Sequence, residues 1–170
     1  MSLRLGRPSD LHDLEEIERS SFEKGRFPRS LLATMLDSGD FLTLVDEEDV
    51  VVGYVSVYLE GPAKARLVSI AVLPEWRGKG AARLLMEGAE EASREREISL
   101  MGLEVGIRNV VALRLYLSQG FGIKGLIKDY YGKGKDAFYM EKALTSGKGA
   151  GARPRDGKHD RLAALPDDDR

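Results

Sequence analysis

Two kinds of hydrophobic periodicity alternate along the first 144 residues. Where apolar residues recur every three or four positions the pattern predicts helices, and short β-branched or aromatic runs between turn residues predict strands. Ser9 or Asp10 is expected to cap the first helix. The expected strands are residues 3–7, 41–45, 50–59, 65–73, 98–105, 121–127 and 137–144, and the expected helices are residues 7–22, 29–36, 78 or 80 to 97, and 109–120.

The order of these elements predicts one α/β domain. A single strand-helix-strand unit, residues 65–105, interrupts a series of strands whose short connections favour antiparallel pairing. We therefore expect a mixed, mostly antiparallel central sheet with helices on both faces. The domain is expected to span residues 1–144, because residues 145–170 are rich in Gly, Ala, Arg and Asp and poor in large apolar side chains. That composition predicts a flexible, disordered tail.

The composition of the chain limits the kinds of partner that it is expected to bind. The chain has 170 residues, with 26 Lys and Arg against 28 Asp and Glu, so no excess of positive charge favours nucleic acid. It has no cysteine and two histidines, so no thiolate or histidine-rich metal site is expected. No apolar run approaches the ~18 residues of a membrane span. We expect a cytoplasmic protein without membrane association.

The segment RGKGAA, residues 77–82, places glycines and basic side chains between a strand and a helix. A helix N-terminus presents unpaired N–H groups and a positive dipole, and glycines let an anion approach them, so the segment suits a phosphate group. It is neither a Walker loop, because Gly80 follows Lys79, nor a dinucleotide fingerprint, because Arg83 replaces the third glycine. A plain glycine turn with surface charge remains an alternative for the hexapeptide alone.

Three stretches of the chain carry a resemblance to a known superfamily. IAVLPEWRGKGAARLL is similar to the acetyl-CoA pyrophosphate loop of the GCN5-related N-acetyltransferase superfamily, and the element order resembles that superfamily from residue 3 to about 144. LEVGIRNVVALRLYLSQGF and DYYGKGKDAFYM resemble segments of its members that acetylate protein N-termini, including the bacterial ribosomal-protein-alanine enzymes and the archaeal and eukaryotic catalytic subunits. The resemblance therefore covers nearly all of the expected domain.

The resemblance implies direct transfer of acetyl from acetyl-CoA to the N-terminal α-amine of a protein or peptide, without a metal. A small amine or a lysine side chain is the alternative acceptor, and a non-catalytic CoA-binding module is a further alternative. The implied partners are a substrate N-terminus, with a ribosomal protein or an auxiliary subunit as candidates, and the protein is expected to be a monomer or homodimer. The implied cofactor contacts are Ile70, Ala71, Val72, Arg77, Gly78, Lys79, Gly80, Ala81, Ala82, Arg83 and Asn109.

Two side chains are candidates for the proton transfers. Glu104 interrupts the apolar run ISLMGLEVGI, and a carboxylate there must lie at a cleft, at a strand end or beside a partner. The resemblance implies that it accepts a proton, and that Tyr116 donates one to the departing thiolate. An exposed strand glutamate and a core aromatic are the structural alternatives. The resemblance also implies that Phe22, Phe27, Pro28, Tyr130 and Tyr131 contact the acceptor.

An N-terminal acceptor lowers the demand on the base. At pH 7.4 an α-amine is ~30% neutral and a lysine ~0.1% neutral, so an N-terminus needs only modest base catalysis. Gly106 and Arg108 stand where the bacterial enzymes typically have arginine and serine, and Ala82 replaces the commoner glycine. These departures concern the acceptor more than the reaction.

Overall fold

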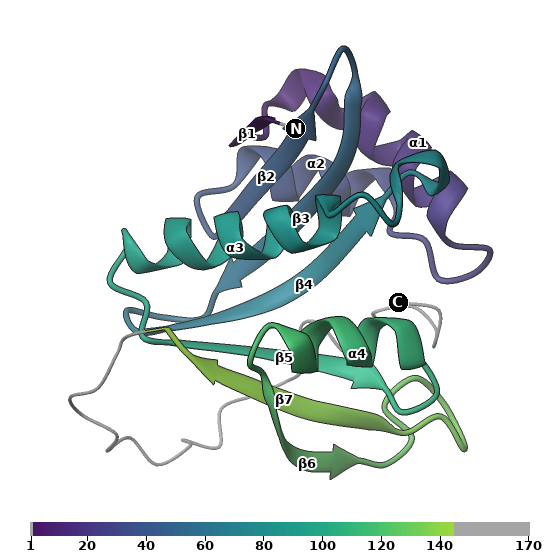
Figure 1. Ribbon diagram of the computed structural model, residues 1–170, viewed down its shortest axis with the longest axis vertical. Coiled ribbons are helices and arrows are strands. Elements are labelled where there is room, and N and C mark those ends of the chain that lie inside the picture. Colours follow the sequence, from purple (N-terminus) through teal and green to yellow (C-terminus); the bar gives the residue numbers. More distant parts are fainter. Residues whose placement is uncertain (1, 145–170) are drawn as a thin grey trace.

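The computed structural model describes residues 2–144, and one seven-stranded sheet runs through them (Figure 1). The strands are β1 (Ser2–Leu5), β2 (Phe41–Glu47), β3 (Val51–Leu59), β4 (Lys64–Val72), β5 (Leu100–Gly106), β6 (Gly122–Ile127) and β7 (Ala137–Ala143). Their order in the sheet is β1-β2-β3-β4-β5-β7-β6, and every neighbouring pair is antiparallel except β4 and β5. The parallel pair follows from the helical crossover that joins them. The predicted mixed, mostly antiparallel sheet is confirmed.

Helices cover both faces of this sheet, as expected. They are α1 (Leu11–Ser21), α2 (Arg29–Asp37), α3 (Ala81–Arg94) and α4 (Val110–Ser118), with short 3-10 turns at Pro8–Asp10 and Pro74–Trp76. Figure 1 shows α1 and α2 behind the sheet and α3 and α4 in front of it. One buried cluster joins α1 and α2 to β2 and β3, and a second joins α3 and α4 to β4, β5 and β7.

The predicted helices are longer than the observed ones at several ends: the first begins at Leu11, where residue 7 was predicted, and the fourth ends at Ser118, where residue 120 was predicted. Asp10 is the N-cap residue of α1 but makes no side-chain cap bond there, because its carboxylate accepts from the Arg7 backbone at 2.7 Å and pairs with Arg4. The third helix ends at Arg94, before the predicted residue 97, and Glu97 adopts a left-handed φ of 61°.

The predicted tail, 145–170, lies outside the described residues. Between residues 2 and 144, no helix is long and apolar enough to cross a membrane.

The two central strands, β4 and β5, pair over three residues only. The pairs are Lys64 with Leu100, Ala65 with Met101 and Arg66 with Gly102, after which the strands separate. A bulge accompanies the separation: Val57 of β3 faces Leu67 and the preceding residue faces Ser69, so Val68 is an extra residue in β4. Because a bulge bends its strand, it turns β4 away from β5.

The closed end of this gap is held by charged side chains of α3. Glu90 is 4% exposed, and both of its carboxylate oxygens accept from the ammonium group of Lys142 on β7, at 2.7 and 2.8 Å. Arg94 also pairs with Glu90 and donates to the backbone carbonyl of Leu144. These contacts join the helix that packs on β2, β3 and β4 to the strand beyond β5.

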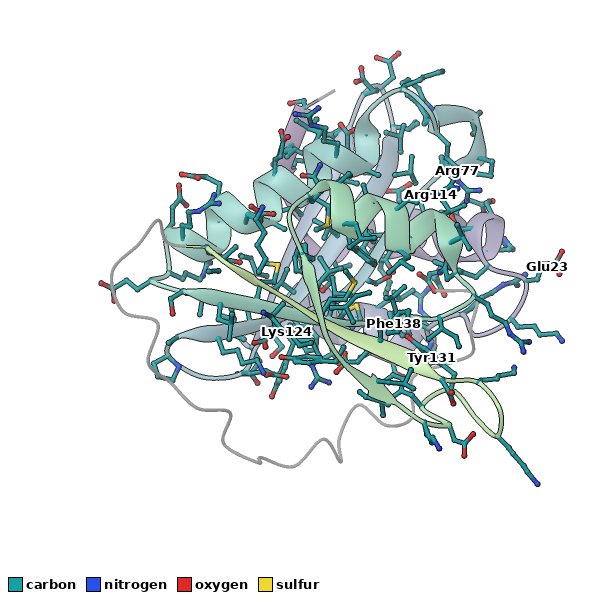
Figure 2. All side chains as sticks on the ribbon, turned by 60° about the horizontal axis from the view of Figure 1, so that its bottom comes forward. Glu23, Arg77, Arg114, Lys124, Tyr131 and Phe138 are labelled. Atoms are coloured by element: carbon teal, nitrogen blue, oxygen red, sulfur yellow. The ribbon has the colours of Figure 1, made fainter. Side chains whose placement is uncertain are left out.

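Replacement of Lys142 by Met should lower the free energy of unfolding by about 1–3 kcal/mol, because it leaves the buried Glu90 with Arg94 as its remaining cation. Urea unfolding followed by circular dichroism measures the change. Lys124→Met, on the exposed edge strand β6 (labelled in Figure 2), is the matched control and should stay within about 0.5 kcal/mol of the parent. Equal losses in both variants would contradict the role given to the Glu90 pair.

Candidate active site

A pocket opens where β4 and β5 separate. Its walls come from five parts of the chain: Phe22 after α1, residues 66–70 of β4, Glu104 of β5, Tyr116 of α4, and Tyr130 with Tyr131 between β6 and β7. Figure 1 shows the α1–α2 loop and the β6–β7 loop at the same end of the sheet, the end at which β4 and β5 are apart. The gap therefore gathers both predicted proton-transfer residues and three of the five predicted acceptor contacts.

Glu104 and Tyr116 approach the pocket from opposite faces of the sheet. Met101, Leu103 and Val105 of β5 pack in the same buried cluster as Tyr116, on the face covered by α3 and α4. Because side chains alternate along a strand, Glu104 points to the other face. A group bound across the gap could therefore contact a carboxylate on one side and a phenol on the other.

Helix α4 positions Tyr116. The side-chain oxygen of Asn109 accepts from the Ala112 backbone at 3.2 Å, so Asn109 caps the start of this helix. Tyr116 is 5% exposed, and its ring meets Phe121 edge to face with centroids 6.0 Å apart. The Phe121 backbone donates to the Tyr116 carbonyl at 3.0 Å. The core packing offered as an alternative for this tyrosine is therefore real, and its ring also lines the pocket.

Glu104 has a buried charged neighbour that the sequence reasoning missed. The Arg66 guanidinium on β4 lies 3.3 Å from Oε1 of Glu104, and the two side chains are 6% and 4% exposed. The same guanidinium pairs through Nε with Glu60 at 2.7 Å. Arg66 interrupts the apolar strand ARLVSIAVL just as Glu104 interrupts its own strand, so the criterion used for Glu104 could have found it.

The β6–β7 connection is a tight, hydrogen-bonded turn. Asp129, at a left-handed φ of 55°, accepts from the Gly134 backbone at 2.6 Å, and its own N–H donates to the Asp136 carboxylate at 2.9 Å. This turn presents Tyr130 and Tyr131, whose rings meet edge to face with centroids 4.8 Å apart. The Tyr131 hydroxyl donates to the Glu104 backbone carbonyl at 3.5 Å. Both tyrosines are thus held beside β5.

The α1–α2 loop forms the facing wall of the pocket. It is held by Glu18, a second buried charged residue that the sequence reasoning missed. Glu18 is 2% exposed, and its carboxylate accepts from the Phe27 backbone at 2.8 Å and from the Tyr54 hydroxyl at 2.5 Å. Phe22 lines the pocket as predicted. Phe27 instead packs in the core beneath α1 and α2, and the exposed Pro28 is the N-cap residue of α2. Helical spacing from Leu14 places Glu18 on the buried face, a signal the sequence already contained.

The loop before α3 has the geometry of an anion site. Gly78 and Gly80 adopt left-handed φ of 70° and 89°, and Gly80 is the N-cap residue of α3. No atom lies within 4 Å of a Cβ built at either glycine, so the space above the helix N-terminus is open. Lys79 lies over the Trp76 ring at 4.8 Å, and Nε of Arg77 donates to the Val72 carbonyl at 3.0 Å. The residues present therefore fit a pyrophosphate.

Figure 2 places Arg77 on the same side of the molecule as Glu23 of the α1–α2 loop and Tyr131 of the β6–β7 turn. The backbone of β4 beyond Arg66, which includes Ile70, leads from the pocket to this loop. Across residues 2–144, no group of three or more histidine, aspartate and glutamate side chains is arranged to hold a metal ion.

Sequence comparison defines the class of protein. The profile of the acetyltransferase (GNAT) family matches residues 10–121, so the chain belongs to this family of acetyltransferases. A Bacillus subtilis protein provisionally assigned as a ribosomal protein bS18-alanine N-acetyltransferase is 31% identical over 141 residues, 82% of this chain and 93% of that protein. An N-alpha-acetyltransferase of Saccharolobus solfataricus is 30% identical over 158 residues, 84% of this chain and 93% of that protein.

Structural comparison agrees on the fold. The crystal structure of the ribosomal-protein-S18-alanine N-acetyltransferase from Escherichia coli superposes with a TM-score of 0.78 at 21% identity, covering 89% of this chain and 99% of that one. The chain is therefore an N-acetyltransferase with the fold of its family, as the resemblance implied.

The environment of Tyr130 predicts a change of stability at alkaline pH. Burial, and secondarily the negative charge of Glu104, raises the pKa of Tyr130 to about 12. An unfolded tyrosine ionises near pH ~10, so above that value the unfolded chain loses a proton that the folded chain keeps, and stability falls as pH rises toward 12. Urea unfolding at pH 9, 10 and 11 should show a smaller decline in Tyr130→Phe than in the parent. Parallel declines would contradict this environment.

Proposed function

We propose that the protein transfers an acetyl group from acetyl-CoA to the N-terminal α-amine of a protein or peptide. The observation that carries the proposal is the pocket between β4 and β5, which two loops enclose beside Glu104: the α1–α2 loop with Phe22 and the β6–β7 turn with Tyr130 and Tyr131. A pocket with two facing walls suits the N-terminus of a polypeptide, because the first residues can be held between the walls while the α-amine reaches toward Glu104. The relatives named for N-terminal acetylation support the same acceptor.

Acetyl-CoA is proposed to bind on the face of α3 and α4. The pyrophosphate is assigned to the N–H groups of residues 78–83, where Gly78 and Gly80 leave room for it. The pantetheine arm is assigned to the backbone of residues 70–72, along the edge of β4 that β5 leaves uncovered. When bound, acetyl-CoA supplies the thioester carbonyl at the gap.

Glu104 and Tyr116 are each assigned one of the two proton transfers of the reaction. As the amine nitrogen bonds to the thioester carbon, the proton that the amine loses passes to the Glu104 carboxylate, directly or through a water molecule. As the carbon–sulfur bond breaks, the Tyr116 hydroxyl gives its proton to the leaving sulfur, and Tyr116 then regains a proton from solvent while Glu104 releases one. The placement of these groups on opposite faces matches the opposite sides from which the amine and the thioester are expected to enter.

A pair of peptides tests the acceptor. Both have the same sequence with one internal lysine, and one has a blocked N-terminus. Incubation with acetyl-CoA followed by tandem mass spectrometry should place the acetyl group on the α-amine of the free peptide and leave the blocked peptide unmodified. Modification of the lysine alone, in both peptides, would show that the acceptor is a side chain.

Replacement of Tyr131 by Ala should lower kcat/KM for the free peptide by about 10-fold or more, because it removes one of the two rings that line the acceptor side of the pocket. A small primary amine needs no such wall and should be affected little. Lys133→Ala, at the exposed tip of the same turn, is the control and should leave both rates near those of the parent.

Replacement of Tyr116 by Phe keeps the ring that packs on Phe121 and removes the hydroxyl. We expect kcat to fall by about 10²-fold, the scale of one lost general acid, with KM for acetyl-CoA nearly unchanged. Release of free CoA thiol measures the rate, and the chain contributes no background because it contains no cysteine. An unchanged kcat would remove Tyr116 from the chemistry.

A further inference from the structure

Arg66 is a buried cation held between two carboxylates. Its Nε lies 2.7 Å from Oε1 of Glu60 and its Nη2 lies 3.3 Å from Oε1 of Glu104. The side chains of Arg66 and Glu104 are 6% and 4% exposed, whereas that of Glu60 is 20% exposed. The row of charges therefore runs from near the surface, at Glu60, to the wall of the pocket, at Glu104.

Because a guanidinium group is rigid and planar, its contact with one carboxylate fixes the direction in which it meets the other. Its donors lie in one rigid plane, so the contact of Nε with Glu60 also sets the direction of Nη2. That direction is toward Glu104, which lies two residues beyond Gly102, the β5 residue paired with Arg66. Removal of one member of a buried pair leaves an uncompensated charge, so Glu104 depends on Arg66 for both its orientation and its charge.

The other titratable groups around Glu104 cannot replace Arg66. Tyr130 of the β6–β7 turn and Tyr139 of β7 both interact with the Glu104 charge, and the pKa of each phenol is raised above its ordinary value, chiefly by burial. Tyr116 of α4 lines the same pocket and is also a phenol. Lys64 lies over the Tyr139 ring and pairs with Glu60. The guanidinium of Arg66, 3.3 Å from Oε1, is thus the cation on which the proposed role of Glu104 rests.

We propose that Arg66 is a positioning residue for the reaction: with Glu60 behind it, Arg66 keeps the Glu104 carboxylate ionised and directed into the pocket, ready to accept the proton of the attacking amine. This inference rests on the proposed role of Glu104. It adds a residue from β4 and one from the β3–β4 turn, both outside the loop and helix motifs by which the sequence was first interpreted.

A double-mutant cycle tests the proposal with whichever amine the peptide experiment identifies as acceptor. Arg66→Met and Glu104→Gln are compared with the double variant, and initial rates are followed by release of CoA thiol. Each single variant should lower kcat by about 10- to 10²-fold, on the scale of one general base. The double variant should be no slower than Glu104→Gln alone, because Arg66 acts only through Glu104. KM for acetyl-CoA should change little in all three.

The pH dependence of kcat/KM separates positioning from stability. In Arg66→Met the acid limb of the profile should move to higher pH, because no guanidinium opposes protonation of Glu104. Arg66→Lys should restore part of the rate and of the profile, since it returns the charge without the planar fork. Glu60→Gln should lower kcat less than Arg66→Met does, because Arg66 keeps its charge and loses only its outer anchor.

Arg4→Met is the matched control. Arg4 also joins two carboxylates, Asp10 and Glu47, each at 2.8 Å, but on β1 at the far edge of the sheet. Its loss should reduce stability without changing kcat or the pH profile.

Three results would contradict the proposal, and they lead to different conclusions. Full activity in Glu104→Gln would overturn the assignment of the base, and Arg66 would then have nothing to position. Impaired Glu104→Gln with a double variant whose losses multiply would overturn the role of Arg66 and leave the base in place. An unshifted acid limb in an Arg66→Met variant that remains folded by circular dichroism would also overturn it.

Discussion

The early separation of β4 from β5 is the constraint on which the site depends. Parallel pairing ends at Arg66 and Gly102, after three residue pairs, and a bulge at Val68 bends β4 away. The backbone of β4 beyond that point gives up its partner strand, which in a buried sheet leaves polar groups that need another partner. The pocket, the proposed path of the pantetheine arm and the approach of side chains from both faces all follow from this one interruption. The charged contacts of Glu90 with Lys142 and Arg94 keep the other end closed.

The gap is surrounded by buried charged side chains, and these restrict the geometry of the site. Glu104 with Arg66 on one strand pair, and Glu18 beneath the α1–α2 loop, are each almost fully removed from solvent. Such groups contribute little net stability, because their desolvation offsets most of their attraction. They do restrict geometry, since any displacement leaves a buried charge or N–H group without its partner. The loop that carries Phe22 is therefore tied to Glu18 through the Phe27 backbone, and the β6–β7 turn that carries the two tyrosines is tied to Asp136 and to the Glu104 backbone.

Sequence reasoning succeeded where the signal is local. The strands and helices follow from periodicity, and the loop before α3 from its glycines at a helix start. It failed where a role depends on register between distant segments. Arg66 and Glu104 are neighbours only because β4 and β5 pair in one particular register, and Glu18 meets Phe27 only once the loop folds back on α1. The resemblance implied that Phe27 contacts the acceptor, whereas its burial in the core depends on how α1 and α2 pack together.

In the proposed reaction, the acetyl donor and the acceptor amine are bound by different elements of the fold. A sequence motif for one therefore says little about the other. The donor half uses backbone N–H groups at the start of α3 and the edge of β4, so it requires glycines and a strand-helix order that a motif records directly. The acceptor half uses side chains on two loops whose shapes are set by Glu18 and Asp129. Changes in those loops can alter the acceptor while the donor site and the Arg66–Glu104 pair stay intact. On the proposed function, acceptor preference would therefore depend on the loops and on the polar contacts that hold them, and not on the motif at residues 77–82.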